Sequence, residues 1–199
     1  TLILTLFPYT TLFRSNPDLV KPTLGPKEPW AYRNKMQMPV GGTKGDIQMG
    51  FYAMGSHDIV QGTNCPIQDE GNNIIAQACY QIAKEFDIEP YDEHTGKGVL
   101  RHIIGRIGQS GWMIILVTAT EQLPHKEKWV EKLTERIPQV ETIVHNVNGK
   151  RTNVILGPKN NILYGDGTIT DHIKDLQFTL SPHSFFQVNP EQTTVLYDQ

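Results

Sequence analysis

Alternating polar and apolar residues, joined by glycine-rich turns, dominate this chain and limit it to sheet-based folds. From Tyr32 to Val40, Met36 and Met38 share one side of an extended chain, and a second alternating stretch begins at Ile47. A period of two is typical of half-buried strands, so the two stretches predict a hairpin with a long loop over residues 41–46. The outer side of the first strand is cationic.

Helical spacing interrupts these strands twice before residue 180. Apolar residues recur three and four positions apart within Glu70–Phe86, and again from Trp129 to Ile137, where Pro138 ends the segment. The resulting order β-β-α-β-β-α-β-β-β lacks strict β-α-β alternation. We therefore predict an α+β fold, with a mixed or antiparallel sheet packed by two helices.

The remaining strands are predicted from turn residues. These strands are expected at Leu100–Gly108, Trp112–Thr118, Glu141–Val147, Thr152–Leu156, Ile162–Tyr164 and Thr168–Leu180. The second of them is apolar throughout, so we expect it to be covered on both faces. Asn148-Gly149 predicts a hairpin. Asn189-Pro190 begins a helix, because asparagine caps helices and proline suits their first position.

Composition narrows the possible function classes. The 199 residues carry a net charge of −3, so nucleic acid could be bound only through a local basic patch. The 2 cysteines, Cys65 and Cys79, exclude a disulfide scaffold and a metal site made of cysteines alone. The longest apolar run, Trp112–Val117, is too short to cross a bilayer, and we expect no membrane partner.

Motifs of a self-contained active site are missing from the sequence. No glycine-rich phosphate loop follows a strand, and the histidines show no metal-binding spacing. His57 and Asp58 are adjacent, which favours a turn over an acid–base pair. Ser184 does not lie in a nucleophile elbow.

Cations on the predicted sheet form the best candidate for a nucleic-acid site. Arg33 and Lys35 share the outer face of the first strand, near Trp30, Tyr32, Phe51 and Tyr52. Neighbouring strands could extend the patch with Arg101, Arg106, Lys150 and Arg151. Such charges suit phosphate contacts, and exposed aromatic rings can stack on bases. The alternative is a solvated sheet face with no ligand.

The chain has the marks of a piece of a longer protein. It begins at Thr1 without methionine, and the helix begun at Asn189 runs to the last residue. Residues 1–15 contain LFPYTTLFRS, which resembles translated sequencing-linker read-through. We expect 1–15 to be non-native, the alternative being a native edge strand.

Several strings, in order, resemble the RNA (uracil-5-)-methyltransferase family. They are EPWAYRNKMQMPVGG (28–42), GFYAMGSHDIV (50–60), NCPIQ (64–68), LRHIIGRIGQSG (100–111), NVNGKRTNVILG (146–157) and LSPHSFFQVNPEQTTVLYDQ (180–199). The resemblance covers about residues 16–199 and is greatest to the 23S ribosomal RNA branch of Gram-positive bacteria. It implies that residues 16–180 form the central domain. Residues 181–199 would lead into a Rossmann-like methyltransferase domain truncated here.

The resemblance also implies site residues. Gln187 falls on the position that contacts S-adenosyl-L-methionine, and Phe185 and Phe186 would help line the uracil pocket. Cys65 falls where many members place the fourth ligand of a [4Fe–4S] cluster. The family's reaction uses a cysteine thiolate that adds to uracil C6, so that C5 can accept the methyl group. Neither Cys65 nor Cys79 matches that nucleophile, so we expect no catalytic residue in this chain and an inactive fragment.

The whole protein is thus expected to be a cytoplasmic, monomeric enzyme of rRNA processing that methylates uridine in 23S rRNA. Two alternatives remain open from the sequence. One is a non-catalytic RNA-binding or Fe–S-containing module, and the other is a structural or oligomerisation domain.

Overall fold

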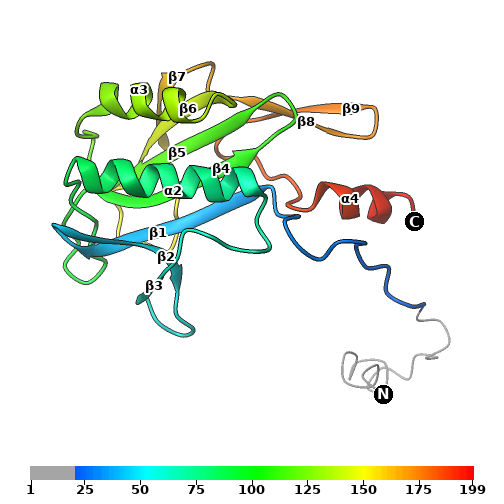
Figure 1. The fold of residues 1–199 in the computed structure, drawn as a ribbon, viewed down its shortest axis with the longest axis horizontal. Helices are drawn as coiled ribbons and strands as arrows, with labels where there is room; N and C mark the ends of the chain where they lie inside the picture. The colour runs from blue at the N-terminus through cyan, green and yellow to red at the C-terminus, as the bar shows by residue number, and fades with distance from the viewer. Residues whose placement is uncertain (1–20) are drawn as a thin grey trace.

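A sheet of seven strands runs through the structure, a computed structural model that describes residues 21–199 (Figure 1). In the order β3-β2-β1-β4-β5-β6-β7, the strands are Ile59–Gln61, Asp46–Tyr52, Lys35–Thr43, Leu100–Ile107, Trp112–Thr118, Val140–Val147 and Lys159–Tyr164. Only β5 and β6 are parallel, and every other neighbouring pair is antiparallel. The predicted α+β class with a mixed sheet is confirmed. The expectation for residues 1–15 lies outside the described residues.

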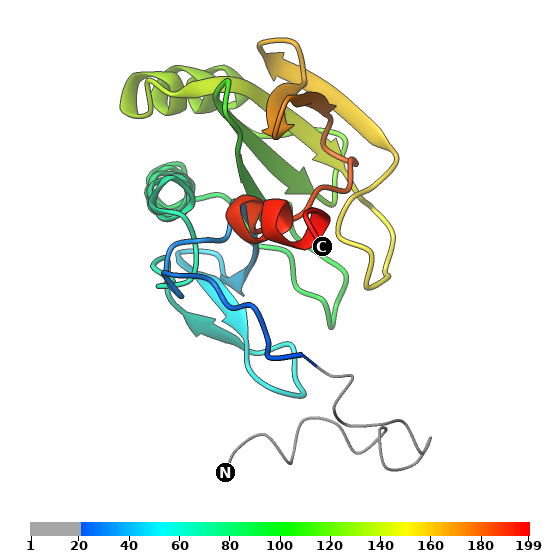
Figure 2. The same ribbon diagram turned by 90° about the vertical axis from the view of Figure 1, so that its right-hand side faces the viewer.

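Two helices cover one face of this sheet, as predicted (Figure 2). They are α2 (Glu70–Glu85), which begins at the cap Asp69, and α3 (Lys126–Arg136), which connects the parallel strands β5 and β6. The core beneath them contains Met36, Met38, Met49, Ile75, Cys79, Ile82, Ile114, Leu116, Trp129 and Leu133. The alternation predicted for the first strand is confirmed, since its two methionines are fully buried.

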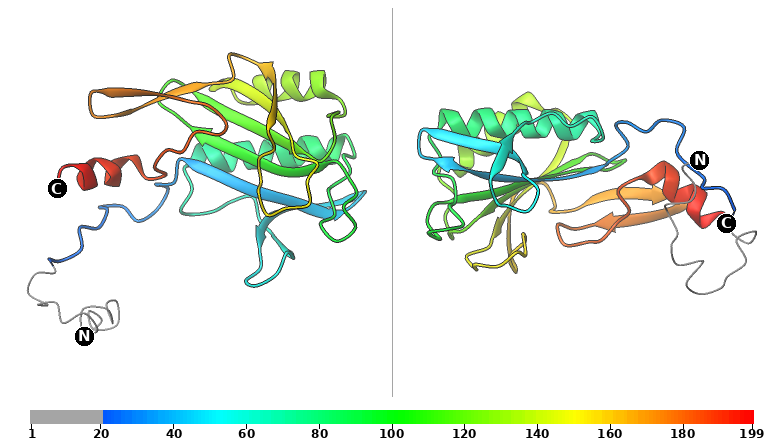
Figure 3. Two further views of the ribbon diagram at one scale, coloured as in Figure 1. Left: turned by 180° about the vertical axis from the view of Figure 1, so that it is seen from behind. Right: turned by 90° about the horizontal axis from the view of Figure 1, so that it is seen from below.

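The opposite face is covered by chain segments instead of helices (Figure 3). A two-stranded sheet of β8 (Ile169–Ile173) and β9 (Leu176–Leu180) packs there through one end, where Ile169 and Leu180 pair, together with part of the loop after β6. Inner side chains of β5 reach both cores, which confirms that this strand is covered on both faces. The helix α4 (Pro190–Tyr197) follows, and Asn189 caps it as predicted.

The hairpin predicted at Asn148-Gly149 is wrong, because β6 pairs with β7 and residues 148–158 form a loop. Buried asparagine side chains explain the difference. Asn148 Nδ2 donates to the carbonyls of Val154 and Ile155, at 2.6 and 2.9 Å. Asn146 exchanges hydrogen bonds with both backbone groups of Gly157. These amides satisfy the loop backbone that a strand partner would otherwise have to satisfy.

Three local predictions also need correction. The loop expected at 41–46 is short, because β1 and β2 remain paired up to Thr43 and Asp46. The short strand β3 was not predicted. The strand expected at 168–180 is instead the β8–β9 hairpin, which turns at Lys174 with a φ of 53°. No helix in the described part of the chain is long and apolar enough to cross a membrane.

Candidate functional site

The segment that carries Phe185, Phe186 and Gln187 is fastened to the sheet at both ends. Before it, Arg106 Nη2 donates to the carbonyl oxygen of Ser184, and more weakly to that of Pro182 at 3.4 Å. After it, the carbonyl oxygen of Val188 accepts from the backbone N–H of Asn34, at 2.9 Å. Both anchors belong to the adjacent ends of β1 and β4, so the sheet sets where these side chains lie.

The three side chains between the anchors have different surroundings. Phe186 packs against the core on the sheet face that β8 and β9 cover, and its ring centroid lies 5.6 Å from that of Phe178. Phe185 is 85% exposed, so its ring is available to a ligand. Gln187 is half-buried and lines a cleft of about 490 Å³. Its other lining residues are the apolar Leu24, Val188, Val195 and Leu196, which provide most of the exposed surface, and the polar Asn189, Gln192, Thr193 and Gln199.

Three cations gather beside the first anchor. Lys35 and Arg106 are register partners across β1 and β4. Arg33 Nε donates to the carbonyl oxygen of Lys35 at 3.0 Å, which holds its guanidinium along the strand. Burial, followed by the charges of Arg106 and Arg33, lowers the pKa of Lys35 to about 8. Within residues 21–199, none of the three forms an ion pair with a carboxylate.

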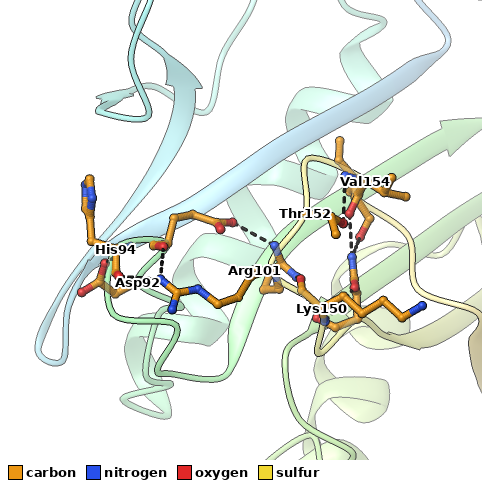
Figure 4. Close-up of polar contacts among 10 residues, drawn as sticks. Asp92, His94, Arg101, Lys150, Thr152 and Val154 are labelled. Carbon is orange, nitrogen blue, oxygen red and sulfur yellow. Dashed lines mark hydrogen bonds and ion pairs between the residues drawn. The ribbon is translucent and has the colours of Figure 1, made fainter.

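Arg101 does not belong to this cluster, so the prediction that it extends the cationic patch needs correction. Its side chain is 1% exposed and pairs with Glu93, with 3.0 Å between Nη2 and Oε1 (Figure 4). Its Nη1 donates to the carbonyls of Asn148 and Lys150, each at 2.8 Å. Its guanidinium carbon also lies 4.4 Å from the ring centroid of Tyr91. Arg101 therefore ties loops together and offers no free charge to a ligand.

Arg151, one of the cations expected to extend the patch, also ties these loops. Its Nη2 donates to the carbonyl of His94, at 2.6 Å, and to that of Glu93, at 3.4 Å. The loop after β6 is thus braced against the loop before β4 by two arginines. Lys150 contributes a carbonyl to this brace, while the residue itself is exposed.

Cys65 lies half-buried in the loop before α2, and Asn73 holds its backbone. The Asn73 side chain accepts from the Cys65 N–H at 3.0 Å and donates to its carbonyl at 3.4 Å. No group of three or more histidine, cysteine or acidic residues lies close enough to hold a metal ion in the described part of the chain. Cys79 is fully buried, and burial raises the pKa of its thiol, as expected for a core residue.

The anchoring roles of Arg106 and Asn34 were not predicted from the sequence. One signal was available: Arg106 follows the apolar Ile103-Ile104-Gly105 in a strand expected to be largely buried, and arginine is rarely buried without a partner. The identity of that partner could not be read from the sequence, since the carbonyls at 182 and 184 lie far along the chain.

Comparison with known proteins gives relatives over nearly the whole chain, although no protein-family model matches. An uncharacterized RNA methyltransferase of Halalkalibacterium halodurans is 47% identical over 182 residues, which are 90% of this chain and 40% of that protein. Uncharacterized RNA methyltransferases of Oceanobacillus iheyensis and Clostridium acetobutylicum are 48% and 45% identical, over 90% and 89% of this chain. The chain thus spans about two fifths of the length of these relatives.

Among solved structures, the fold is similar to that of the Pyrococcus abyssi tRNA (uracil-54, C5)-methyltransferase in complex with S-adenosyl-L-homocysteine. The TM-score is 0.69 at 22% sequence identity, and the match covers 86% of this chain and 40% of that one. At this identity the likeness establishes the fold.

Proposed function

The chain belongs to the same family as these bacterial RNA methyltransferases, and from that premise we propose that the whole protein methylates C5 of a uridine in RNA. The methyl donor is S-adenosyl-L-methionine, which supplies an activated methyl group when bound. The identity of 47% over 182 residues to a protein named as an RNA methyltransferase carries the proposal. Uracil specificity is supported by the sequence resemblance and by a shared fold with a uracil C5 methyltransferase.

In this proposal, the part of the protein described here positions the substrate and one edge of the cofactor. Gln187 offers an amide in a largely apolar cleft, which fits one edge of a nucleoside-like cofactor. The exposed ring of Phe185 is suited to stacking on an unpaired base, and Phe186 forms a fixed wall behind it. A target base must leave its stack to reach such a place.

The covalent step is assigned to residues outside this chain. A thiolate is the nucleophile in the proposed reaction, and the buried Cys79 thiol is held in its neutral form by a raised pKa. We further propose that residues 16–180 are a central domain, that residues 181–199 lead into the catalytic domain, and that the enzyme is a cytoplasmic monomer acting on 23S rRNA. Cys65 would be one ligand of a [4Fe–4S] cluster, whose other ligands would have to come from beyond the described residues.

The test uses the whole protein, ribosomal RNA and S-adenosyl-L-methionine carrying a labelled methyl group. We expect labelled 5-methyluridine in the digested RNA and no product from the 199-residue chain alone. Gln187→Ala should slow methyl transfer by about tenfold to a hundredfold, the usual loss for one hydrogen bond to a charged group. Gln177→Ala, an exposed glutamine of β9, is the matched control and should leave the rate unchanged.

Two outcomes would contradict the proposal. Methyl transfer to another base or to another RNA position would exclude the uridine C5 reaction. Turnover by the 199-residue chain alone would place the catalytic residues inside it.

A further inference from the structure

We propose that Arg33, Lys35 and Arg106 form a binding site for one RNA phosphodiester, next to the base that lies against Phe185 and Phe186. The inference rests on the proposed function and deepens it, because it states which part of the RNA is held here and by which atoms. We call these three residues the cation cluster.

The positive charge of the cation cluster is not compensated by acidic residues in the described part of the chain. Elsewhere in the described chain, partly buried cations have acidic partners, as Arg101 has Glu93 and Lys132 has Glu85. The cation cluster has none, although Lys35 is half-buried and Arg106 is 4% exposed. Like charges held together away from water are unfavourable unless an anion joins them. The cluster is therefore suited to an anionic ligand.

Arg106 and Lys35 differ in how many of their hydrogen-bond donors are already used. Arg106 is committed to the backbone carbonyls at 182 and 184, and its buried Nε has no partner among the described residues. Its charge adds positive electrostatic potential beside Lys35, its register partner on β1. Lys35 makes no side-chain hydrogen bond within residues 21–199, so its three ammonium donors remain available. Lys35 is thus the residue that contacts the ligand, and Arg106 is the positioning residue.

The cation cluster adjoins the segment that carries Phe185 and Phe186. Lys35, Arg106 and Phe186 line the same small hollow, together with Asn34 and Leu180. The carbonyl held by Arg106 belongs to Ser184, the residue directly before Phe185. A nucleotide joins its phosphate to its base through one sugar. A base held by the phenylalanines therefore brings a phosphate close to Lys35.

The pKa of Lys35 supports this geometry. Burial and the two arginines lower it to about 8, which means that these surroundings disfavour the ammonium form. A phosphodiester stays ionised at neutral pH and would offset the repulsion from Arg33 and Arg106. Phosphate binding and full protonation of Lys35 therefore favour each other.

The test is a salt titration of binding between the 199-residue chain and a fluorescein-labelled single-stranded oligouridylate, followed by anisotropy. We expect Lys35→Gln to weaken binding about tenfold at low salt, because one charge-assisted contact is lost. It should also reduce the slope of log affinity against log salt by about 0.7, the value for one phosphate contact with a single strand. Lys35→Arg should retain most of the affinity.

Lys44→Gln is the control, because Lys44 lies in the turn after the same strand and its side chain is 67% exposed. It should leave affinity and slope unchanged. A Lys35→Gln chain that unfolds at the wild-type denaturant concentration, yet binds with the same slope as Lys44→Gln, would overturn the inference. So would a wild-type chain that binds no oligouridylate at low salt while the whole protein methylates uridine, and that pair of results would leave the proposed function standing.

The link between phosphate and base is tested with mononucleotides by nitrogen–proton NMR. Uridine 5′-monophosphate should shift backbone signals both at Lys35 and at Phe185–Gln187. Inorganic phosphate should shift only the signals near Lys35, and uridine only those of the other segment. If uridine 5′-monophosphate moved only one of the two groups of signals, the phosphate site would not be adjacent to the base site.

Discussion

At each end of strand β4 a buried arginine binds the backbone of a distant segment, but the charge of only one of the two arginines is compensated. At one end, Arg101 donates to carbonyls of residues 148–150, and at the other end Arg106 donates to carbonyls of residues 182–184. Both arginines are buried, and both fasten a distant segment to the sheet. Only Arg101 is neutralised, by Glu93.

The difference separates a structural tie from a binding site. A buried arginine that holds two carbonyls and a carboxylate has its charge compensated and most of its donors satisfied, so it has no free charge for a ligand. At the Arg106 end the nearby side chains add charge of the same sign, from Lys35 and Arg33. The Arg101 end has its charge compensated within the described chain, although its buried Nε has no partner there. The Arg106 end, with no acidic partner, is suited to an anion from outside.

The largest expected effect is the loss of stability in Arg101→Met. The substitution removes the ion pair and leaves the Glu93 carboxylate, with 30% of its side chain exposed, without its partner. Breaking a buried pair from one side typically costs about 3 kcal/mol or more. Urea unfolding of the 199-residue chain should show this decrease in the free energy of unfolding. A loss below about 1 kcal/mol, the usual range of exposed pairs, would contradict the structural role.

Arg106→Met should destabilise the chain less. The substitution removes one hydrogen bond from a charged donor to the Ser184 carbonyl, worth about 1.5–3 kcal/mol, and a weak one to that of Pro182, but it also relieves the repulsion on Lys35. We expect a net loss of about 1–2 kcal/mol in the same urea experiment, together with faster amide hydrogen exchange in residues 184–188. If Arg106→Met cost as much as Arg101→Met, the two ends of the strand would not differ in charge balance.

Lys35→Gln should have the smallest effect on stability, within about 0.5 kcal/mol, because its ammonium makes no described hydrogen bond or ion pair. Its large effect is expected on RNA binding. A substitution that leaves folding intact but weakens RNA binding is what distinguishes a ligand-binding charge from a structural one.

Features that depend on neighbouring residues could be predicted from the sequence, whereas features that depend on distant segments could not. The alternation of Met36 and Met38 and the cap at Asn189 depend on neighbouring residues, so both predictions are confirmed. Arg101 and Arg106 look alike in the sequence, and both were expected to be exposed cations of one patch. Their partners come from other segments, and a register shift between Leu100 and His102 changes which way the strand presents its side chains.

The candidate site was predictable only in part, for the same reason. The FFQ segment was recognisable as a string, but its two anchors are Asn34, directly before β1, and Arg106 in β4. The failed hairpin at Asn148 is a similar case, since a turn signal was outweighed by side-chain amides that bind the loop backbone.

Lys35 offers the most direct test of the cation cluster, because the pKa of its ammonium group should change when a phosphate binds beside it. Arg106 faces it from β4 and Arg33 from the preceding residues, and burial also lowers the pKa of Arg106 from its ordinary value. The segment packed against the cluster contributes Leu180 and Phe186 to the same hollow, and its exposed His183 lies between the two residues whose carbonyls Arg106 holds.

The measurement is an NMR pH titration of the Lys35 ammonium group in the 199-residue chain, without and with saturating oligouridylate. We expect a pKa of about 8 in the free chain and a rise toward the ordinary 10.5 in the complex, because the phosphate offsets the two arginines. RNA affinity should accordingly fall as the pH rises through the free pKa, and Lys35→Arg should remove that fall. A pKa that stays near 8 in the saturated complex would contradict the phosphate site.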